Sequence, residues 1–151
     1  MRDILATVSR WEADGRRAAI ATVVERRGSA PRDPGASLAL NDLGEIAGSV
    51  TGGCVEPSVI REAQEVLDGG GARLREYGIA DDTAFEVGLA CGGTVGILIA
   101  PFDTGLVPAL ARTVEEDRLA ALTLVASGER IGAQELHADP GGAVARLVEA
   151  G

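Results

Sequence analysis

The chain has 151 residues, a formal net charge of -9 and 21 glycines, and all 14 of its basic residues are arginine. Without lysine there is no Schiff-base amine and no phosphate-binding lysine of the GxxxxGK type, and one histidine excludes a histidine-rich metal site and argues against a Ser-His-Asp triad. The acidic balance and the few aromatic residues argue against nucleic-acid binding. The reactive groups that remain are two thiols, the arginines, the carboxylates and the glycine-rich backbone.

The first 50 residues predict a helix, a buried strand and a hairpin. Residues 2–14 have apolar side chains at helical spacing, and the β-branched run 18–25 is typical of a buried strand. Residues 26–35 form a loop by their Gly, Ser and Pro content, and residues 36–50 predict two strands joined by a turn at 41–44.

The remaining residues alternate helices and strands. The expected order is a helix from Val55 to the Gly69–Gly71 stop, a strand over 72–77, a helix-like segment over 80–93, a strand over 94–100, a helix over 106–116, a strand over 119–126, a loop over 128–140 and a helix over 142–149. This order predicts a single α/β domain with a mixed β-sheet, an opening hairpin followed by alternating strands and helices.

The apolar runs are too short to cross a membrane. None approaches the roughly 18 residues that a spanning helix needs, and the N-terminus lacks the apolar core of a signal peptide. We therefore expect a cytoplasmic protein without a membrane span, in which Cys54 and Cys91 are free thiols rather than a disulfide.

Two inverted cysteine turns are the most informative feature of the sequence. Gly52-Gly53-Cys54 leads from a strand into a helix, and Cys91-Gly92-Gly93 leads into a strand. Glycine pairs let the backbone approach a ligand, and their N–H groups at a helix start predict a nest that receives an anion. The helix dipole also favours the thiolate form of a cysteine at this position. The alternative is that each cysteine only packs beside the sheet.

The sequence leaves two alternative roles open for Glu56 and for a group of three arginines. Glu56 follows Cys54 by two residues, so it either accepts hydrogen bonds from a ligand's amino groups or has a structural role. Arg26, Arg27 and Arg32 gather around one loop, which is most often a solvated edge but also suits anion binding.

The segments GEIAGSVTGGCVEPSVIREAQEVL and EVGLACGGTVGILIAPF, in this order, resemble the N-terminal domain of the XdhC/CoxI family. The resemblance covers about residues 19–102 and implies that residues 1–151 form such a domain, without the C-terminal Rossmann-like domain that is usual in the family. The family is associated with the maturation of molybdenum hydroxylases, such as xanthine dehydrogenase and carbon monoxide dehydrogenase.

The resemblance implies an accessory protein that binds the molybdenum cofactor (molybdopterin) as cargo, supports its sulfuration and passes it to the apoenzyme. The expected partners are the molybdenum hydroxylase apoenzyme, a cysteine desulfurase and further copies of the chain in a homo-oligomer. We expect no catalytic residue, and Cys54 is also expected to contact molybdenum. The expected cofactor-binding residues are Cys54, Cys91, Gly52, Gly53, Glu56, Gly92, Gly93 and Arg32.

Two alternatives stay open. One is a thiol-dependent sulfur-transfer or redox enzyme that uses Cys54, in which the cysteine forms a persulfide or a disulfide. The other is an oligomerising module that only docks the target dehydrogenase. These alternatives differ in whether the thiols are needed, which makes the two cysteines the residues to test.

Overall fold

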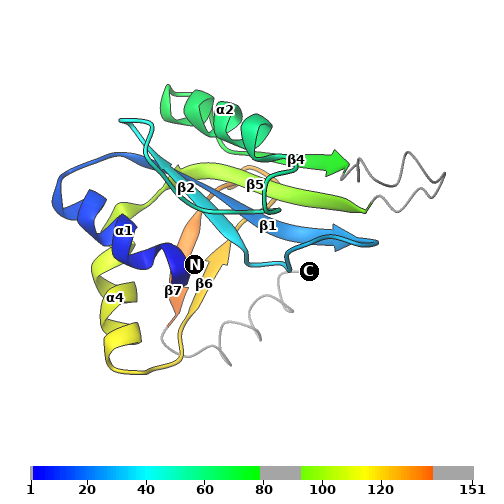
Figure 1. Cartoon of the computed structure of the whole chain (residues 1–151). Coiled ribbons are helices and arrows are strands. Elements are labelled where there is room, and N and C mark those ends of the chain that lie inside the picture. The colour runs from blue at the N-terminus through cyan, green and yellow to red at the C-terminus, as the bar shows by residue number, and fades with distance from the viewer. Residues whose placement is uncertain (1, 79–92, 138–151) are drawn as a thin grey trace.

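A computed structural model describes residues 2–78 and 93–137 of the chain (Figure 1). It contains a five-stranded sheet, a separate two-stranded hairpin and helices on both faces of the larger sheet. The helices are α1 (Arg2–Ala13), α2 (Glu56–Leu67), the 3-10 turn η1 (Thr104–Leu106) and α4 (Val107–Glu115). The strands are β1 (Ala18–Arg27), β2 (Ser37–Asn41), β3 (Ile46–Gly48), β4 (Arg73–Gly78), β5 (Thr94–Phe102), β6 (Ala121–Leu124) and β7 (Gln134–His137).

The large sheet has the strand order β3-β2-β1-β5-β4. Each of its described strand pairs is antiparallel, so the sheet is joined by hairpins and by connections that cross one face. The two longest strands, β1 and β5, lie in the centre and pair from Ala18 opposite Phe102 to Arg27 opposite Thr94. The predicted α/β class is confirmed, and the described strand pairs are antiparallel throughout.

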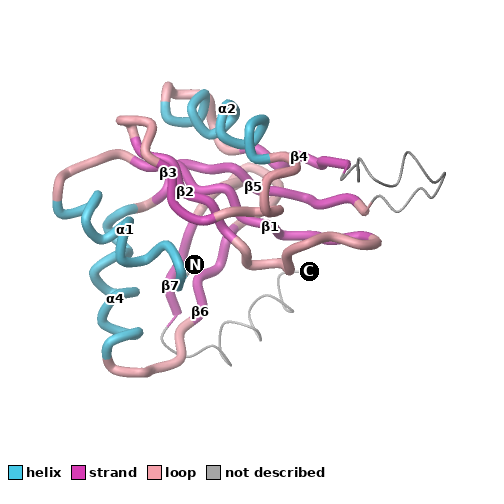
Figure 2. Tube along the Cα trace, in the orientation of Figure 1, coloured by secondary structure: helices cyan, strands magenta, loops and turns pink. Residues whose placement is uncertain are grey.

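Both faces of the large sheet are buried under helices (Figure 2). Alternate side chains of β1 point to opposite faces, as the two-residue period of a strand requires. Ala19, Ala21 and Val23 belong to the core cluster under α2, whereas Ala18 and Ile20 belong to the cluster under α1 and α4. This explains why residues 18–23 are apolar or small without the alternation of a one-sided strand.

Most of the predicted elements are confirmed, and one is wrong. The helices over 2–14 and 106–116, the strands over 18–25 and 94–100 and the hairpin over 36–50 are present with small changes at their ends. The predicted loop over 128–140 contains strand β7, because residues 134–137 pair with β6 in a register that a short polar sequence does not reveal. The segment 80–92 and the predicted helix over 142–149 lie outside the described residues. Within the described part of the chain, no helix is long and apolar enough to cross a membrane.

Candidate functional site

The first cysteine turn connects β3 to α2. Gly52 and Gly53 have φ angles of +88° and +129°, which place both residues in backbone conformations that side chains disfavour. A Cβ atom added at either position would meet no atom within 4 Å. Glycine is therefore required here by the path of the backbone and not by a lack of space.

The side chain of Glu56 organises this turn from the first residue of α2. Its carboxylate accepts six hydrogen bonds, from backbone N–H groups and hydroxyl groups of the preceding residues. Oε1 accepts from Ser49 Oγ (2.6 Å), Thr51 N (2.8 Å), Gly52 N (2.9 Å) and Val50 N (3.2 Å), and Oε2 accepts from Thr51 Oγ1 (2.6 Å) and Gly53 N (2.8 Å). Because a carboxylate offers about four acceptor positions, this one is filled by the chain itself.

The protonation of Glu56 follows from these contacts. Partial burial acts to raise the pKa of its carboxyl group, but the hydrogen bonds from Ser49, Thr51 and the backbone outweigh burial and hold the pKa well below its usual range. The carboxylate is therefore ionised at neutral pH. The predicted nest of N–H groups is present, and the anion that it receives in this structure is the Glu56 carboxylate, to which Gly52 and Gly53 donate.

Cys54 lies on the solvent side of this turn. Its thiol is free, as the sequence predicted, and the structure shows that the residue is exposed. The neighbouring Val55 is buried, and its N–H donates to Thr51 Oγ1 (3.3 Å), so the residue after the cysteine is fixed by packing and by a hydrogen bond. The turn thus presents one thiol to solvent at the start of a packed helix.

The second cysteine turn is described only at Gly93, because Cys91 and Gly92 lie outside the described residues. Gly93 is buried, and a Cβ atom added to it would lie 2.7 Å from the carbonyl oxygen of Arg27 and would also overlap the carbonyl oxygen of Ser29. The glycine permits a close approach of backbone, as predicted. What approaches is the chain's own loop after β1.

Each of the three arginines at the end of β1 and in the loop after it forms an ion pair with a carboxylate. Arg26 contacts Asp33 (3.1 Å), Arg27 contacts Glu25 (2.8 Å) and Glu76 (3.7 Å), and Arg32 contacts Asp3 (3.5 Å). All four pairs are exposed to solvent, where an ion pair contributes between about 0 and 1 kcal/mol. These arginines therefore form a solvated edge of the sheet, as the more common of the two interpretations predicts. Their guanidinium groups can exchange one carboxylate partner for another anion.

The cysteine turn and the arginine loop lie at the same end of the large sheet (Figure 1). Arg17 at the start of β1 donates a hydrogen bond to the carbonyl oxygen of Leu67 at the end of α2, so helix and strand run in opposite directions. The first turn of α2 therefore lies toward the end of β1, where Arg27 is opposite Thr94 of β5. Arg32 contacts the start of α1, which covers the opposite face of the sheet from α2.

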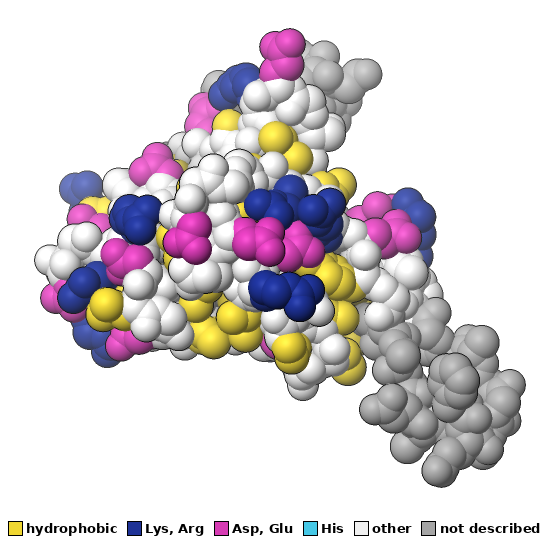
Figure 3. All heavy atoms as spheres, turned by 90° about the horizontal axis from the view of Figure 1, so that it is seen from above, with side chains coloured by type: hydrophobic (Ala, Val, Ile, Leu, Met, Phe, Trp, Pro, Cys, Tyr) yellow, Lys and Arg dark blue, Asp and Glu magenta, His cyan; other side chains and the backbone are white. Residues whose placement is uncertain are grey.

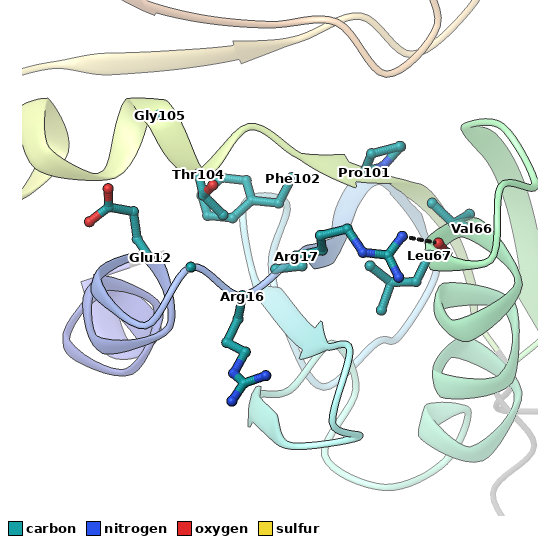
Figure 4. A pocket seen from close by; sticks show the side chains of 11 residues that line it. Glu12, Arg16, Arg17, Val66, Leu67, Pro101, Phe102, Thr104 and Gly105 are labelled. Atoms are coloured by element: carbon teal, nitrogen blue, oxygen red, sulfur yellow. Dashed lines mark hydrogen bonds between the residues drawn. The ribbon is translucent and has the colours of Figure 1, made fainter.

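A cavity of about 540 Å³ lies at the other end of the sheet (Figure 4). Its lining includes Glu12, Arg16, Arg17, Leu67 and Phe102, and none of the predicted site residues that the structure describes contributes to it. Figure 4 shows the Arg17 guanidinium directed toward the end of α2, and Arg16 directed the other way. No motif in the sequence points to this cavity, because its walls come from segments that are far apart along the chain.

A network of charged groups fixes α2 to β4, and sequence reasoning missed it. Glu62 accepts hydrogen bonds from Tyr77 Oη (3.0 Å) and Arg75 Nε (2.8 Å), and Arg73 lies 2.8 Å from Glu65. Burial and the bond to Glu62 raise the pKa of Tyr77 to about 12. Figure 3 shows arginine and acidic side chains interleaved over this face, so its charges are paired.

Comparison with known proteins identifies a family and relatives that each match about half of the chain. Residues 11–78 match the model of the XdhC and CoxI family, which confirms the predicted resemblance for this region. The molybdenum cofactor insertion chaperone PaoD of Escherichia coli (strain K12) is 36% identical over 85 residues, covering 56% of this chain and 26% of PaoD. A probable xanthine dehydrogenase subunit of Bacillus subtilis (strain 168) is 33% identical over 86 residues, covering 56% of this chain and 26% of that protein.

The fold is shared with a solved structure. A xanthine dehydrogenase from Bacillus halodurans superposes with a TM-score of 0.64 at 21% sequence identity, covering 89% of this chain and 42% of that one. The alignments with the two curated relatives span about a quarter of their lengths. The family match includes the turn at Cys54, whereas the second cysteine turn lies beyond residue 78.

Proposed function

We propose that the chain, whose residues 11–78 match the model of the XdhC and CoxI family, is an accessory protein for insertion of the molybdenum cofactor into a molybdenum hydroxylase. The chain binds the cofactor as cargo and hands it to the apoenzyme. Support comes from the relative PaoD, whose name describes a chaperone for the insertion of this cofactor. The match to these relatives spans about a quarter of their lengths.

The observation that carries the proposal is the exposed thiol of Cys54 on a turn fixed by Glu56. Thiolate is a soft ligand, which suits a metal that already carries the two sulfur atoms of a dithiolene. Cys54 therefore fits the metal end of the cargo. We assign Cys54 as the first contact and Cys91 as the second, with Gly52, Gly53, Gly92 and Gly93 shaping the backbone around them.

The phosphate end of the cargo needs a different group. The N–H groups of Gly52 and Gly53 do not fit it, because they donate to Glu56. Arg32 does fit, since its ion pair with Asp3 is long (3.5 Å), and it lines an open groove of about 560 Å³. A phosphate can replace the carboxylate there by charge-assisted hydrogen bonds, which are stronger than neutral ones.

The experiment is to express the chain together with the enzymes of cofactor synthesis and to measure oxidised pterin released from the purified protein by fluorescence. The wild type is expected to retain the cofactor stoichiometrically, and Cys54→Ser to retain at least about tenfold less, the effect usual for weakening a metal site. Glu45→Gln, at the turn between β2 and β3, is the control and is expected to match the wild type. A wild type without pterin would contradict the proposal, as would full retention by Cys54→Ser and Cys91→Ser alike, which is the result that a pure docking module predicts.

The exposure of Cys54 favours a second role, the transfer of sulfur to the cargo. In this step the Cys54 thiolate attacks the terminal sulfur of a persulfide on a cysteine desulfurase, a new S–S bond forms, and the desulfurase leaves as its thiolate. Incubation with the desulfurase and cysteine is expected to add the mass of one sulfur atom to the chain, removable by a reducing thiol. The same mass gain in Cys54→Ser would contradict this role for Cys54.

A further inference from the structure

We propose that Glu56 is a positioning residue that acts through the turn before α2 to hold Cys54 in solvent, and that it does not contact the cargo. The inference rests on the proposed function only for the identity of that cargo. It replaces the expectation that Glu56 binds a ligand's amino groups. It also means that the anion bound by the N–H groups of Gly52 and Gly53 is the Glu56 carboxylate and not a group of the cargo.

The geometry of the carboxylate carries the first step. Its six donors come from five consecutive residues, 49–53, and both oxygen atoms are engaged at distances of 2.6 to 3.2 Å. A ligand's amino group would have to displace one of these donors and leave it without a partner. Such a displacement costs more than the new hydrogen bond returns, because the lost bonds are made to a charged group.

The backbone explains why a carboxylate is needed at this position. The N–H groups of Thr51, Gly52 and Gly53 converge on one point just before the positive end of the α2 dipole. A glutamine keeps one acceptor but turns an NH₂ group toward Gly53 N, which is itself a donor and cannot accept a hydrogen bond. The turn would then lose this bond and its counter-charge together.

The position of Cys54 follows from the same contacts. Gly53 is bonded to Glu56, and Val55 is buried and bonded to Thr51, so the residues on both sides of Cys54 are fixed. The thiol is left as the exposed group between two anchored neighbours. Because the nest is filled, an anion of the cargo is kept away from these amides, and the thiol is offered to the metal end.

The test uses the full chain, and Cys91→Ser is added for the alkylation measurement alone, where it leaves Cys54 as the one thiol. Glu56→Gln is compared with Glu45→Gln, a matched change at another turn, where Glu45 Oε2 accepts from Asn41 Nδ2 (2.7 Å). Three quantities are measured: amide hydrogen exchange at Gly52 and Gly53, the ratio of alkylation rates of Cys54 with iodoacetate and iodoacetamide, and retained pterin.

Glu56→Gln is expected to speed exchange at both glycines by at least about tenfold, the equivalent of one lost bond to a charged group. It is expected to raise the iodoacetate-to-iodoacetamide ratio, because the negative charge that fills the nest near Cys54 is removed. It is also expected to lower retained pterin. Glu45→Gln should leave all three at the values of its parent. A change in overall stability alone would not move the ratio of the two alkylation rates.

Unchanged exchange and an unchanged alkylation ratio in Glu56→Gln would overturn the inference, and so would full retention of pterin despite a loosened turn. If Glu56→Gln does not fold, Ser49→Ala removes one donor to Oε1 and one acceptor of the Gly52 N–H group but keeps the charge of Glu56. Exchange at Gly53, which donates to Glu56, is then expected to speed up by a smaller factor, and unchanged exchange at Gly53 would again overturn the inference. A wild type that retains no pterin, together with faster exchange in Glu56→Gln, would contradict the proposed function and support the role of Glu56.

Discussion

The two ends of α2 are stabilised in different ways. The first end follows a turn that exposes a thiol, whereas the second end is only a packing contact with the start of β1. At the first end, a carboxylate of the helix itself gathers the preceding backbone N–H groups and leaves Cys54 exposed. At the second end, the carbonyl oxygen of Leu67 accepts from Arg17, fifty residues earlier in the chain. The interactions at the first end join residues that are close together in the sequence. The interaction at the second end is a tertiary contact beside a cavity.

The largest effect is expected from Gly53→Ala. A Cβ atom at φ +129° is strained even though the space around it is open, so we expect a loss of about 2 to 3 kcal/mol in the free energy of unfolding. Gly69→Ala, at the second end, has the less extreme φ of +101° and should lose less. Denaturant unfolding measures both, and an equal loss in the two variants would contradict the difference between the ends.

Thr51→Val should have the next largest effect on stability. It removes the hydrogen bond from Thr51 Oγ1 to Glu56 Oε2 (2.6 Å) and the acceptor for Val55 N, while the buried volume stays nearly the same. Loss of a bond to a charged group predicts about 1.5 to 2 kcal/mol in the free energy of unfolding. Thr113→Val, whose hydroxyl donates only to the carbonyl oxygen of Leu110, is the control and should lose less.

Arg17→Met probes the second end of the helix. It removes the hydrogen bond to the Leu67 carbonyl oxygen (2.9 Å) but keeps much of the apolar stem, so we expect a loss of about 1 kcal/mol. Arg16→Met, in the same cavity wall, should change stability by less than about 0.5 kcal/mol. If thermal unfolding shows a larger loss for Arg16→Met than for Arg17→Met, the hydrogen bond from Arg17 does not stabilise the end of α2.

The last effect is a pH dependence of stability that is confined to acid. Because the pKa of Glu56 is lower in the folded chain than its ordinary value of 4.5, its ionisation stabilises the fold fully above that value, and the contribution is lost as pH falls toward the folded pKa. The stability difference between the wild type and Glu56→Gln should therefore be constant above about pH 5 and shrink below it. A difference that grows in acid would show that the sign is wrong.

The sequence predicts elements well where local pattern decides them. The apolar spacing of residues 2–13 and the glycines after Leu67 are enough to place α1 and the end of α2. The sequence does not predict the directions of the strands or the presence of β7. Tertiary packing selects the pairing partners of a strand, and residues 134–137 lack a clear alternation of apolar and polar side chains.

At the site, the sequence predicts the glycine pair and Cys54, because the path of the backbone requires glycine and the expected chemistry requires a thiol. The sequence does not predict the role of Glu56 in the same way. A glutamate at a helix start suits the helix dipole in any protein, and only the structure shows that its carboxylate turns back to the preceding N–H groups. The spacing of Glu56 after two glycines and a hydroxyl-rich segment is the signal that points to this arrangement.

The most direct test of the account is the molybdenum content per chain after co-expression with cofactor synthesis, compared between Cys54→Ser at the first end of α2 and Arg17→Met at the second. We predict that Cys54→Ser loses the metal by at least about tenfold and that Arg17→Met keeps the wild-type content. Loss of metal in Arg17→Met with full content in Cys54→Ser would place the cargo in the cavity and contradict the account.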